Sequence, residues 1–205
     1  MTVPAPEPFV PFQHPAGKAP LVSEIRSTLV VSSLQSLRTH GLFDRYVAEL
    51  APKDRDALLG LIAGTWIPLA TAEPHYRALD RLQLSTDVVE SIGGDVAQRV
   101  NKTLLSTIIR ASRSAGVTPW TLLSHVHRFR ELSWRGSDIA VYKLGPKDAR
   151  FEWVAQPLAE IPYFVTSLGG YLAALAGLFS TKAYARLERD VVWRSYRIRY
   201  RMSWA

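Results

Sequence analysis

The sequence predicts an α+β fold in which a helical N-terminal half is followed by a ββαββ antiparallel sheet with a central apolar helix. Apolar residues recur at helical spacing up to residue 136, and β-branched and aromatic runs follow it. At 205 residues and 47% hydrophobic side chains, the chain suits one domain with a sizeable core. We expect a proline-rich extended arm over 1–20 and a single α+β domain over 21–205, divided into a helical part, 21–136, and a ββαββ part, 137–205.

The arm is predicted from its prolines, six of which lie between Pro4 and Pro20. Proline removes amide donors and favours extended chain over helix or central strand. Phe9, Val10 and Phe12 are candidates to dock the arm onto the body. A mobile tail is the alternative, and the sequence leaves both open.

The helical half is expected to contain several amphipathic helices separated by glycine and proline. The first begins at Leu21 and stops before Gly41, and the segment that follows Gly93-Gly94 either continues one long helix or starts a second. Thr118 before Pro119 has the pattern of a helix start. The expected ranges are 21–37, 43–50, 52–62, 72–82, 84–116 and 118–134.

The second half is expected to form two hairpin-like pairs around a helix. Segments 137–144 and 149–156 are strand-like and are separated by a loop of hairpin length, and 182–191 and 193–204 follow the helix. The last strand places Arg197, Arg199 and Arg201 on one face. Cross-strand acids such as Glu188 or Glu152 are their expected partners, because opposite charges pair across a sheet.

Residues 161–181 carry no charge, and this length would suffice to span a bilayer. We interpret the segment as a buried core helix, with a membrane helix as the alternative. Pro162, Thr166 and Ser167 near its start, and strands on both sides that require a core, favour burial.

Composition excludes several classes of function. The chain has no Cys, which removes disulfides, thiolate zinc sites, iron–sulfur clusters and cysteine nucleophiles. No phosphate-binding glycine loop, zinc-binding H-E-x-x-H or G-x-S-x-G serine motif is present, so we expect no catalytic residue, metal or cofactor. An enzyme whose site is assembled from scattered residues is the alternative. The N-terminal segment lacks a secretory pattern and we expect a cytoplasmic protein.

A net charge of +7 is compatible with an anionic partner. The basic residues are mostly Arg and are spread along the chain without a run, so nucleic acid is not the expected partner. An interaction protein that uses this basic surface is an alternative function. The oligomeric state is not predicted.

Aromatic residues and histidines mark the candidate ligand-binding site. His125 and His127 point to nearly opposite sides of a helix and cannot chelate one metal together. His127 shares a helix face with Trp120 and is either a ligand contact or a satisfied core group. The candidate pocket residues, expected between helices and sheet, are Trp66, His75, Tyr76, Trp120, His127 and Tyr163.

Most of the chain after the arm resembles a family restricted to myxobacteria that has no assigned activity. The stretches that carry this resemblance are LFDRYVAEL, LLGLIAGTWIPLATAEPHYRALD, IGGDVAQRV, AGVTPWTLL, LGPKDARFEW, IPYF and the closing strand.

The order of helices followed by ββαββ is also similar to the superfamily of heme-nitric-oxide-binding and vinyl-reductase-like domains. Its heme-binding members carry Y-x-S-x-R-x-G, whereas this chain has Tyr163 and Gly169 but Val165 and Ser167 in place of Ser and Arg. The resemblance therefore implies a small-molecule-binding or signalling module without enzymatic activity, for which heme is not expected and an apolar or aromatic ligand is. A heme-binding gas sensor is the alternative.

Overall fold

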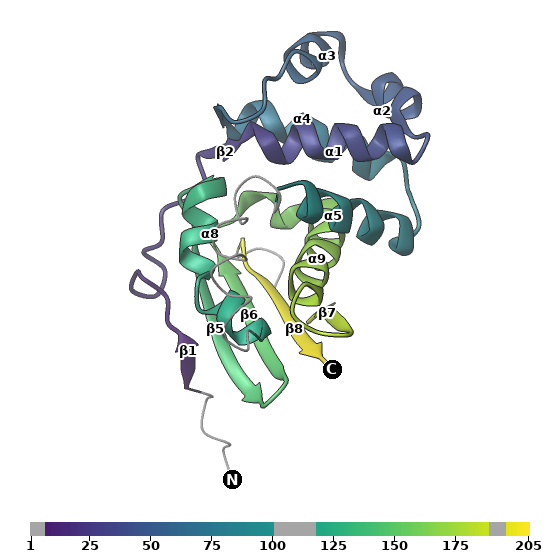
Figure 1. The fold of residues 1–205 in the computed structure, drawn as a ribbon. Coiled ribbons are helices and arrows are strands. Elements are labelled where there is room, and N and C mark those ends of the chain that lie inside the picture. The colour runs from purple at the N-terminus through teal and green to yellow at the C-terminus, as the bar shows by residue number, and fades with distance from the viewer. Residues whose placement is uncertain (1–6, 101–117, 189–195) are drawn as a thin grey trace.

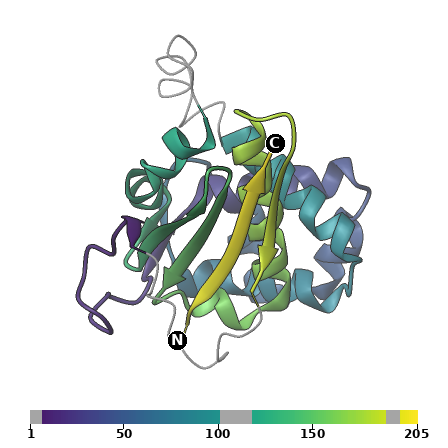
Figure 2. The ribbon, with the colours of Figure 1, turned by 90° about the horizontal axis from the view of Figure 1, so that it is seen from below.

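The main sheet has five antiparallel strands, and its helices lie behind one face of it (Figure 2). A computed structural model describes residues 7–100, 118–188 and 196–205. In sheet order the strands are β1 (Pro8–Val10), β5 (Asp138–Gly145), β6 (Asp148–Val154), β8 (Ile198–Trp204) and β7 (Ala183–Leu187). The predicted α+β class and the ββαββ order are confirmed.

The strands of a second, smaller sheet are very short, and the sequence pattern did not predict them. In sheet order they are β3 (Trp66–Pro68), β2 (Glu24–Arg26) and β4 (Trp134–Arg135). The expectation of a helix from Leu21 is wrong, because β2 pairs on both sides and α1 (Ser27–Thr39) begins only after it. The chain changes from strand to helix at Ser27, whose N–H donates to the carbonyl oxygen of Thr65 at 2.9 Å.

Most predicted helices are present (Figure 1). α5 runs through Gly93-Gly94 without a break, whereas the helix expected over 118–134 is divided at Ser124 and His125. The part of the expected helix beyond residue 100 lies outside the described residues. The remaining helices are α2 (Phe43–Glu49), α3 (Pro52–Leu59), α4 (Leu69–Arg81), α5 (Thr86–Val100), α7 (Pro119–Leu123), α8 (Val126–Ser133), the 3-10 turn η2 (Pro157–Glu160) and α9 (Pro162–Gly177).

The apolar helix α9 is a core element, packed between α5 and the sheet (Figure 1). Its buried side chains include Phe164, Val165 and Leu172. The Asp80 carboxylate accepts the backbone N–H of Tyr163 at 2.8 Å and so satisfies one free donor at the helix start. None of the helices in the described part of the chain is long and apolar enough to cross a membrane.

α5 and α9 cross with their backbones in close contact, and two glycines permit it. A Cβ atom on Gly93 would lie 1.9 Å from the carbonyl oxygen of Ser167, and one on Gly170 would lie 2.1 Å from that of Glu90. Gly169 faces the sheet instead, with Tyr200 at 3.3 Å from its ideal Cβ position. Any side chain at Gly93 or Gly170 would therefore push the two helices apart.

The arm docks onto the body from Pro8 onward. β1 pairs with β5, Val10 is buried, and the Phe9 ring packs edge-on against Trp120 with centroids 5.0 Å apart. His14 donates its backbone N–H to the buried carboxylate of Asp138 at 2.7 Å, and its Nδ1 lies 3.0 Å from the same oxygen. Of the two alternatives for the arm, the structure has the docked one.

Deleting residues 1–20 is therefore expected to lower the melting temperature by about 5 °C or more, which corresponds to about 1–2 kcal/mol in a chain of this size. The deletion exposes the edge of β5 and leaves the buried Asp138 without its His14 donors, and an unsatisfied buried group is costly. Thermal unfolding followed by circular dichroism measures the loss. Asp138→Asn should reproduce part of it, and an unchanged melting temperature in both variants would contradict the docked arm.

The outer face of the sheet carries paired charges. Glu152 accepts from both Arg197 and Arg199 at 3.1 Å, as the alternation in the last strand predicted, whereas Glu188 pairs with Arg150. Arg201 pairs with Asp148 at 2.5 Å. Much of the positive charge on this face is therefore balanced by neighbouring carboxylates.

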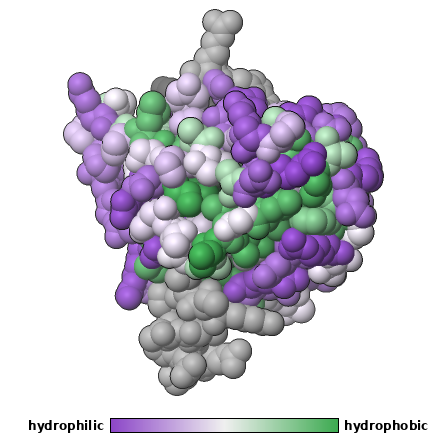
Figure 3. All heavy atoms as spheres, turned by 90° about the horizontal axis from the view of Figure 1, so that it is seen from above, coloured by the Kyte–Doolittle hydropathy of each residue, from purple (hydrophilic) through white to green (hydrophobic). Residues whose placement is uncertain are grey.

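The opposite end of the molecule, which carries α1 to α4, has a band of apolar side chains bordered by hydrophilic ones (Figure 3). Leu59 in α3 and Ile62 just after it are 39% and 75% exposed. Exposed apolar side chains thus lie at this end of the molecule.

Candidate ligand-binding site

An apolar cavity of about 120 Å³ lies between the helices and the inner face of the sheet. Its walls come from elements far apart in the sequence: Ile92 and Val96 on α5, Val126 on α8, Phe151 on β6 and Leu172 on α9. A cavity of this kind appears where a helical layer covers a sheet incompletely, and such places are frequent ligand sites.

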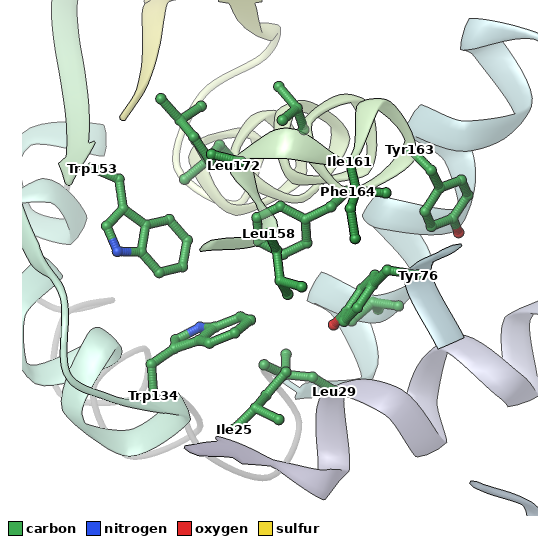
Figure 4. Close-up of a cluster of buried hydrophobic side chains, with 14 of the residues drawn as sticks. Ile25, Leu29, Tyr76, Trp134, Trp153, Leu158, Ile161, Tyr163, Phe164 and Leu172 are labelled. Carbon is green, nitrogen blue, oxygen red and sulfur yellow. The ribbon is translucent and has the colours of Figure 1, made fainter. Parts of the chain in front are cut away.

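Aromatic rings form one wall of the cavity (Figure 4). Trp134 from β4 meets Trp153 from β6 edge-to-face with centroids 5.2 Å apart, and Phe164 of α9 lies 5.8 Å from Trp134. Tyr76 of α4 packs on the other side of Phe164 at 5.2 Å. Figure 4 shows Tyr163 beyond this group, with its hydroxyl directed away from the two tryptophans.

Few polar residues line the cavity, and three of them carry a buried polar atom that has no hydrogen-bond partner among the described residues. These atoms are Nε of Arg130, Nε1 of Trp153 and the hydroxyl of Tyr163, all of which are buried. Burial raises the pKa of Tyr163, and the Ser33 hydroxyl partly opposes the rise, although the two groups do not form a hydrogen bond of normal geometry. Burial also raises the pKa of Tyr76. Both phenols are therefore neutral at physiological pH and can donate.

Two of the six residues proposed from the sequence, Tyr76 and Tyr163, line the cavity. His75 lies behind it, fully buried, with Nδ1 2.8 Å from the Tyr46 hydroxyl and Nε2 3.0 Å from the Ser33 hydroxyl. Burial lowers the pKa of His75 to about 3, so its ring is neutral. His75 supports the wall residue Ser33 and does not itself border the cavity.

The other three candidates lie on other parts of the molecule. Trp66 of β3 is held between Arg26 and Arg135, whose guanidinium carbons are 4.5 and 4.6 Å from its ring centre. Trp120 packs against Phe9 and Trp204.

His127 is turned toward the arm, and its Nε2 lies 2.9 Å from the Pro11 carbonyl oxygen. The structure brings His75 and Tyr76 together, with centroids 5.1 Å apart, but does not bring Trp66 to them. Trp66 therefore lies apart from the other aromatic candidates His75 and Tyr76.

Sequence reasoning missed Arg130, Ser133 and Trp153 as cavity residues. A signal for Arg130 was present, because it follows Leu122 and Val126 at four-residue spacing on the buried stripe of this region. A charged residue at a buried position of an apolar helix face indicates a candidate functional residue. Trp153 gave no such signal, since an aromatic residue in a strand is ordinary.

The molecule belongs to the α+β domains in which one antiparallel sheet is covered on one face by helices, and its fold is that of the H-NOX domains. An H-NOX mutant from K. algicida aligns with a TM-score of 0.64 at 10% identity, over 88% of this chain and 97% of its own. An oxygen-binding H-NOX domain related to soluble guanylate cyclases gives 0.60 at 11% identity, over 88% and 95%.

A structure described as modulating heme redox potential through porphyrin distortion gives 0.58 at 12% identity, over 88% of this chain and 100% of its own. No protein-family model and no curated protein matches the chain. At these identities the likeness shows the fold alone.

The residues present do not fit heme. Heme iron in proteins is most often held by a histidine that faces the porphyrin. None of the five histidines, all within the described residues, borders the cavity: His40 bonds to Asp95, His125 is exposed, and His14, His75 and His127 have the partners given above. At the positions where the heme clamp would stand, Val165 is buried and the Ser167 hydroxyl donates to the Phe164 carbonyl at 3.0 Å.

Proposed function

We propose that this protein is a non-enzymatic module that binds a small, largely apolar molecule in the cavity between α5, α8, α9 and the sheet, and that it does so without heme. One observation carries the proposal. Aliphatic and aromatic residues line the cavity together with three residues whose buried donors have no acceptor in the described part of the chain, whereas buried polar groups in folded proteins are normally hydrogen-bonded. A ligand with an apolar body and an acceptor group would bury the walls and satisfy donors together.

The size of the cavity supports a ligand of about one aromatic ring. An apolar cavity of roughly 150 Å³ in another protein holds benzene, and this one measures about 120 Å³. Heme is far larger than such a space. A signalling role in the cytoplasm, with a protein partner that reads the bound state, is part of the proposal and draws on the H-NOX-like fold by analogy only.

The alternative of an interaction protein that uses its basic surface has less support. Arginines on the sheet face are paired with Glu152, Glu188 and Asp148. Charges paired with neighbouring carboxylates in this way leave little net positive potential for an anionic partner. Retention on nucleic acid that decreases with salt would favour this alternative.

Binding of a neutral one-ring probe tests the proposal. Toluene or benzyl alcohol is expected to raise the melting temperature in a saturable way, because a ligand that binds only the folded state stabilises it. Val96→Phe places a ring in the cavity and should abolish the shift. Val47→Phe makes the same change on α2, away from the cavity, and should leave it unchanged.

Two results would overturn the proposal. One is equal probe binding by the wild type and Val96→Phe, which would place the probe elsewhere. The other is a sharp Soret shift on hemin titration that saturates at one equivalent and disappears in His127→Ala, which would establish the heme-sensor alternative. Native mass spectrometry of the purified protein adds a direct search for a retained ligand.

A further inference from the structure

The cavity has one charged residue among the described residues that line it, and that residue is Arg130. No Asp, Glu, Lys or His joins it there. Arg130 is 8% exposed, so its guanidinium is largely removed from water. A cation beside an apolar, weakly polarisable space produces a positive potential that water does not screen.

Most of the acceptors that hold the guanidinium in place are neutral. Nη1 donates to the carbonyl oxygens of Gly136 at 2.9 Å and Ser137 at 3.3 Å, and Nη2 donates to Oε1 of Gln13 at 2.9 Å. These bonds fix the group on the wall without neutralising its charge. Nε has no acceptor among the described residues.

The acids near Arg130 compensate its charge poorly. Glu131 accepts a hydrogen bond from Nη2 at 3.1 Å, but its side chain is 57% exposed, so water screens much of its charge. Asp138 is buried nearby in the chain, yet its oxygens are taken by His14 and by the N–H of Ile139, and it does not line the cavity. A buried cation without a buried anion is costly, so an anion at this wall would be favourable.

We infer that the ligand is a small apolar monocarboxylic acid, whose hydrocarbon or aromatic body fills the cavity and whose carboxylate lies at Arg130. This inference rests on the proposed function and names the chemical class of its ligand. Carboxylate oxygens form short, charge-assisted hydrogen bonds with guanidinium groups. Ser133, one turn after Arg130 on the same cavity wall, is a second donor for the carboxylate.

A charge series on the wild-type protein tests the inference. Benzoate, benzyl alcohol and benzamidine share one ring and differ in charge, being anionic, neutral and cationic at neutral pH. We expect benzoate to bind about tenfold or more tightly than benzyl alcohol, and benzamidine to bind least. Isothermal titration calorimetry measures the three affinities.

A variant pair assigns the preference to one side chain. Arg130→Gln should reduce benzoate affinity at least tenfold and change benzyl alcohol affinity less than threefold. Arg128→Gln removes a charge from an exposed position on the same helix and should leave all affinities as in the wild type.

The outcomes separate the two proposals. Binding of benzyl alcohol as tightly as benzoate, or of benzamidine as tightly as benzoate, overturns the acid ligand and leaves an apolar site. Failure of all three probes and toluene overturns the binding function itself. If Arg130→Gln does not fold, the charge series on the wild type still decides.

Discussion

Replacing Gly93 with alanine is expected to destabilise the protein by about 3 kcal/mol, in the upper range for overpacked cores. The added methyl carbon would lie 1.9 Å from the carbonyl oxygen of Ser167 and 2.8 Å from its carbonyl carbon. Both are backbone atoms of α9 and cannot rotate away, so the two helices must separate. In a chain of this size the melting temperature should fall by roughly 6–12 °C.

Gly94→Ala is the matched control, since it adds the same methyl group to the same helix one residue later. Its nearest neighbour would be Cβ of Ala174 at 3.7 Å, an ordinary contact. Alanine is a better helix former than glycine by up to about 1 kcal/mol, so this variant should be unchanged or slightly more stable. Equal losses in the two variants would show that the close contact of Gly93 with Ser167 does not determine the effect.

Gly93 and Ser167 also border the cavity, so separation of α5 and α9 should change ligand binding as well as stability. At a temperature where Gly93→Ala is still folded, we expect weaker binding of benzyl alcohol than in the wild type or Gly94→Ala.

The long elements of this fold were predictable because each has a periodic pattern. The hairpin β5–β6 and the helix α9 follow the expected ranges closely, since several alternating or apolar residues specify each of them. The three-residue strand β2 was not predictable, because a period cannot be read from so few residues. In this region Val22, Ile25 and Leu29 have the three-to-four-residue spacing that also marks α1. Val22 and Ile25 nevertheless lie before the helix begins.

The cavity was only partly predictable. Its location between helices and sheet follows from the layer order, and Tyr76 and Tyr163 lie on its wall. Which aromatic residues meet there depends on tertiary contacts: Trp66 pairs with arginines and His127 turns to the arm. The role of Arg130 depends on carbonyl groups that only the folded chain brings to it.

Acid is expected to destabilise the protein through His75, well above the pH at which most carboxylates titrate. Burial lowers the pKa of this histidine from 6.5 to about 3 in the folded state, whereas the unfolded chain binds the proton near pH 6.5. The unfolded state therefore binds more protons between these values, and stability falls as the pH falls through the window. The stabilisation is fully present above pH 6.5.

Within this window the free energy of unfolding should fall by about 1.4 kcal/mol for each pH unit of acidification. From this group alone, the protein is then roughly 2 kcal/mol less stable at pH 5 than at pH 7. Urea unfolding at a series of pH values measures it. His75→Gln should flatten the profile, and His125→Gln, at an exposed position, should not. If the stability of His75→Gln depends on pH as steeply as that of the wild type, another group causes the acid sensitivity.

Protonation of His75 should also affect ligand binding in the cavity. One ring nitrogen of the neutral histidine must accept a hydrogen bond, and Tyr46 and Ser33 are its two partners. A protonated ring can only donate, so a hydroxyl must reverse its role, and Ser33 borders the cavity. Because the pKa of His75 in the folded state is about 3, we expect the affinity for benzyl alcohol, which does not titrate, to be unchanged between pH 7 and pH 5 and to fall only as the pH approaches 3. His75→Gln should lose this dependence.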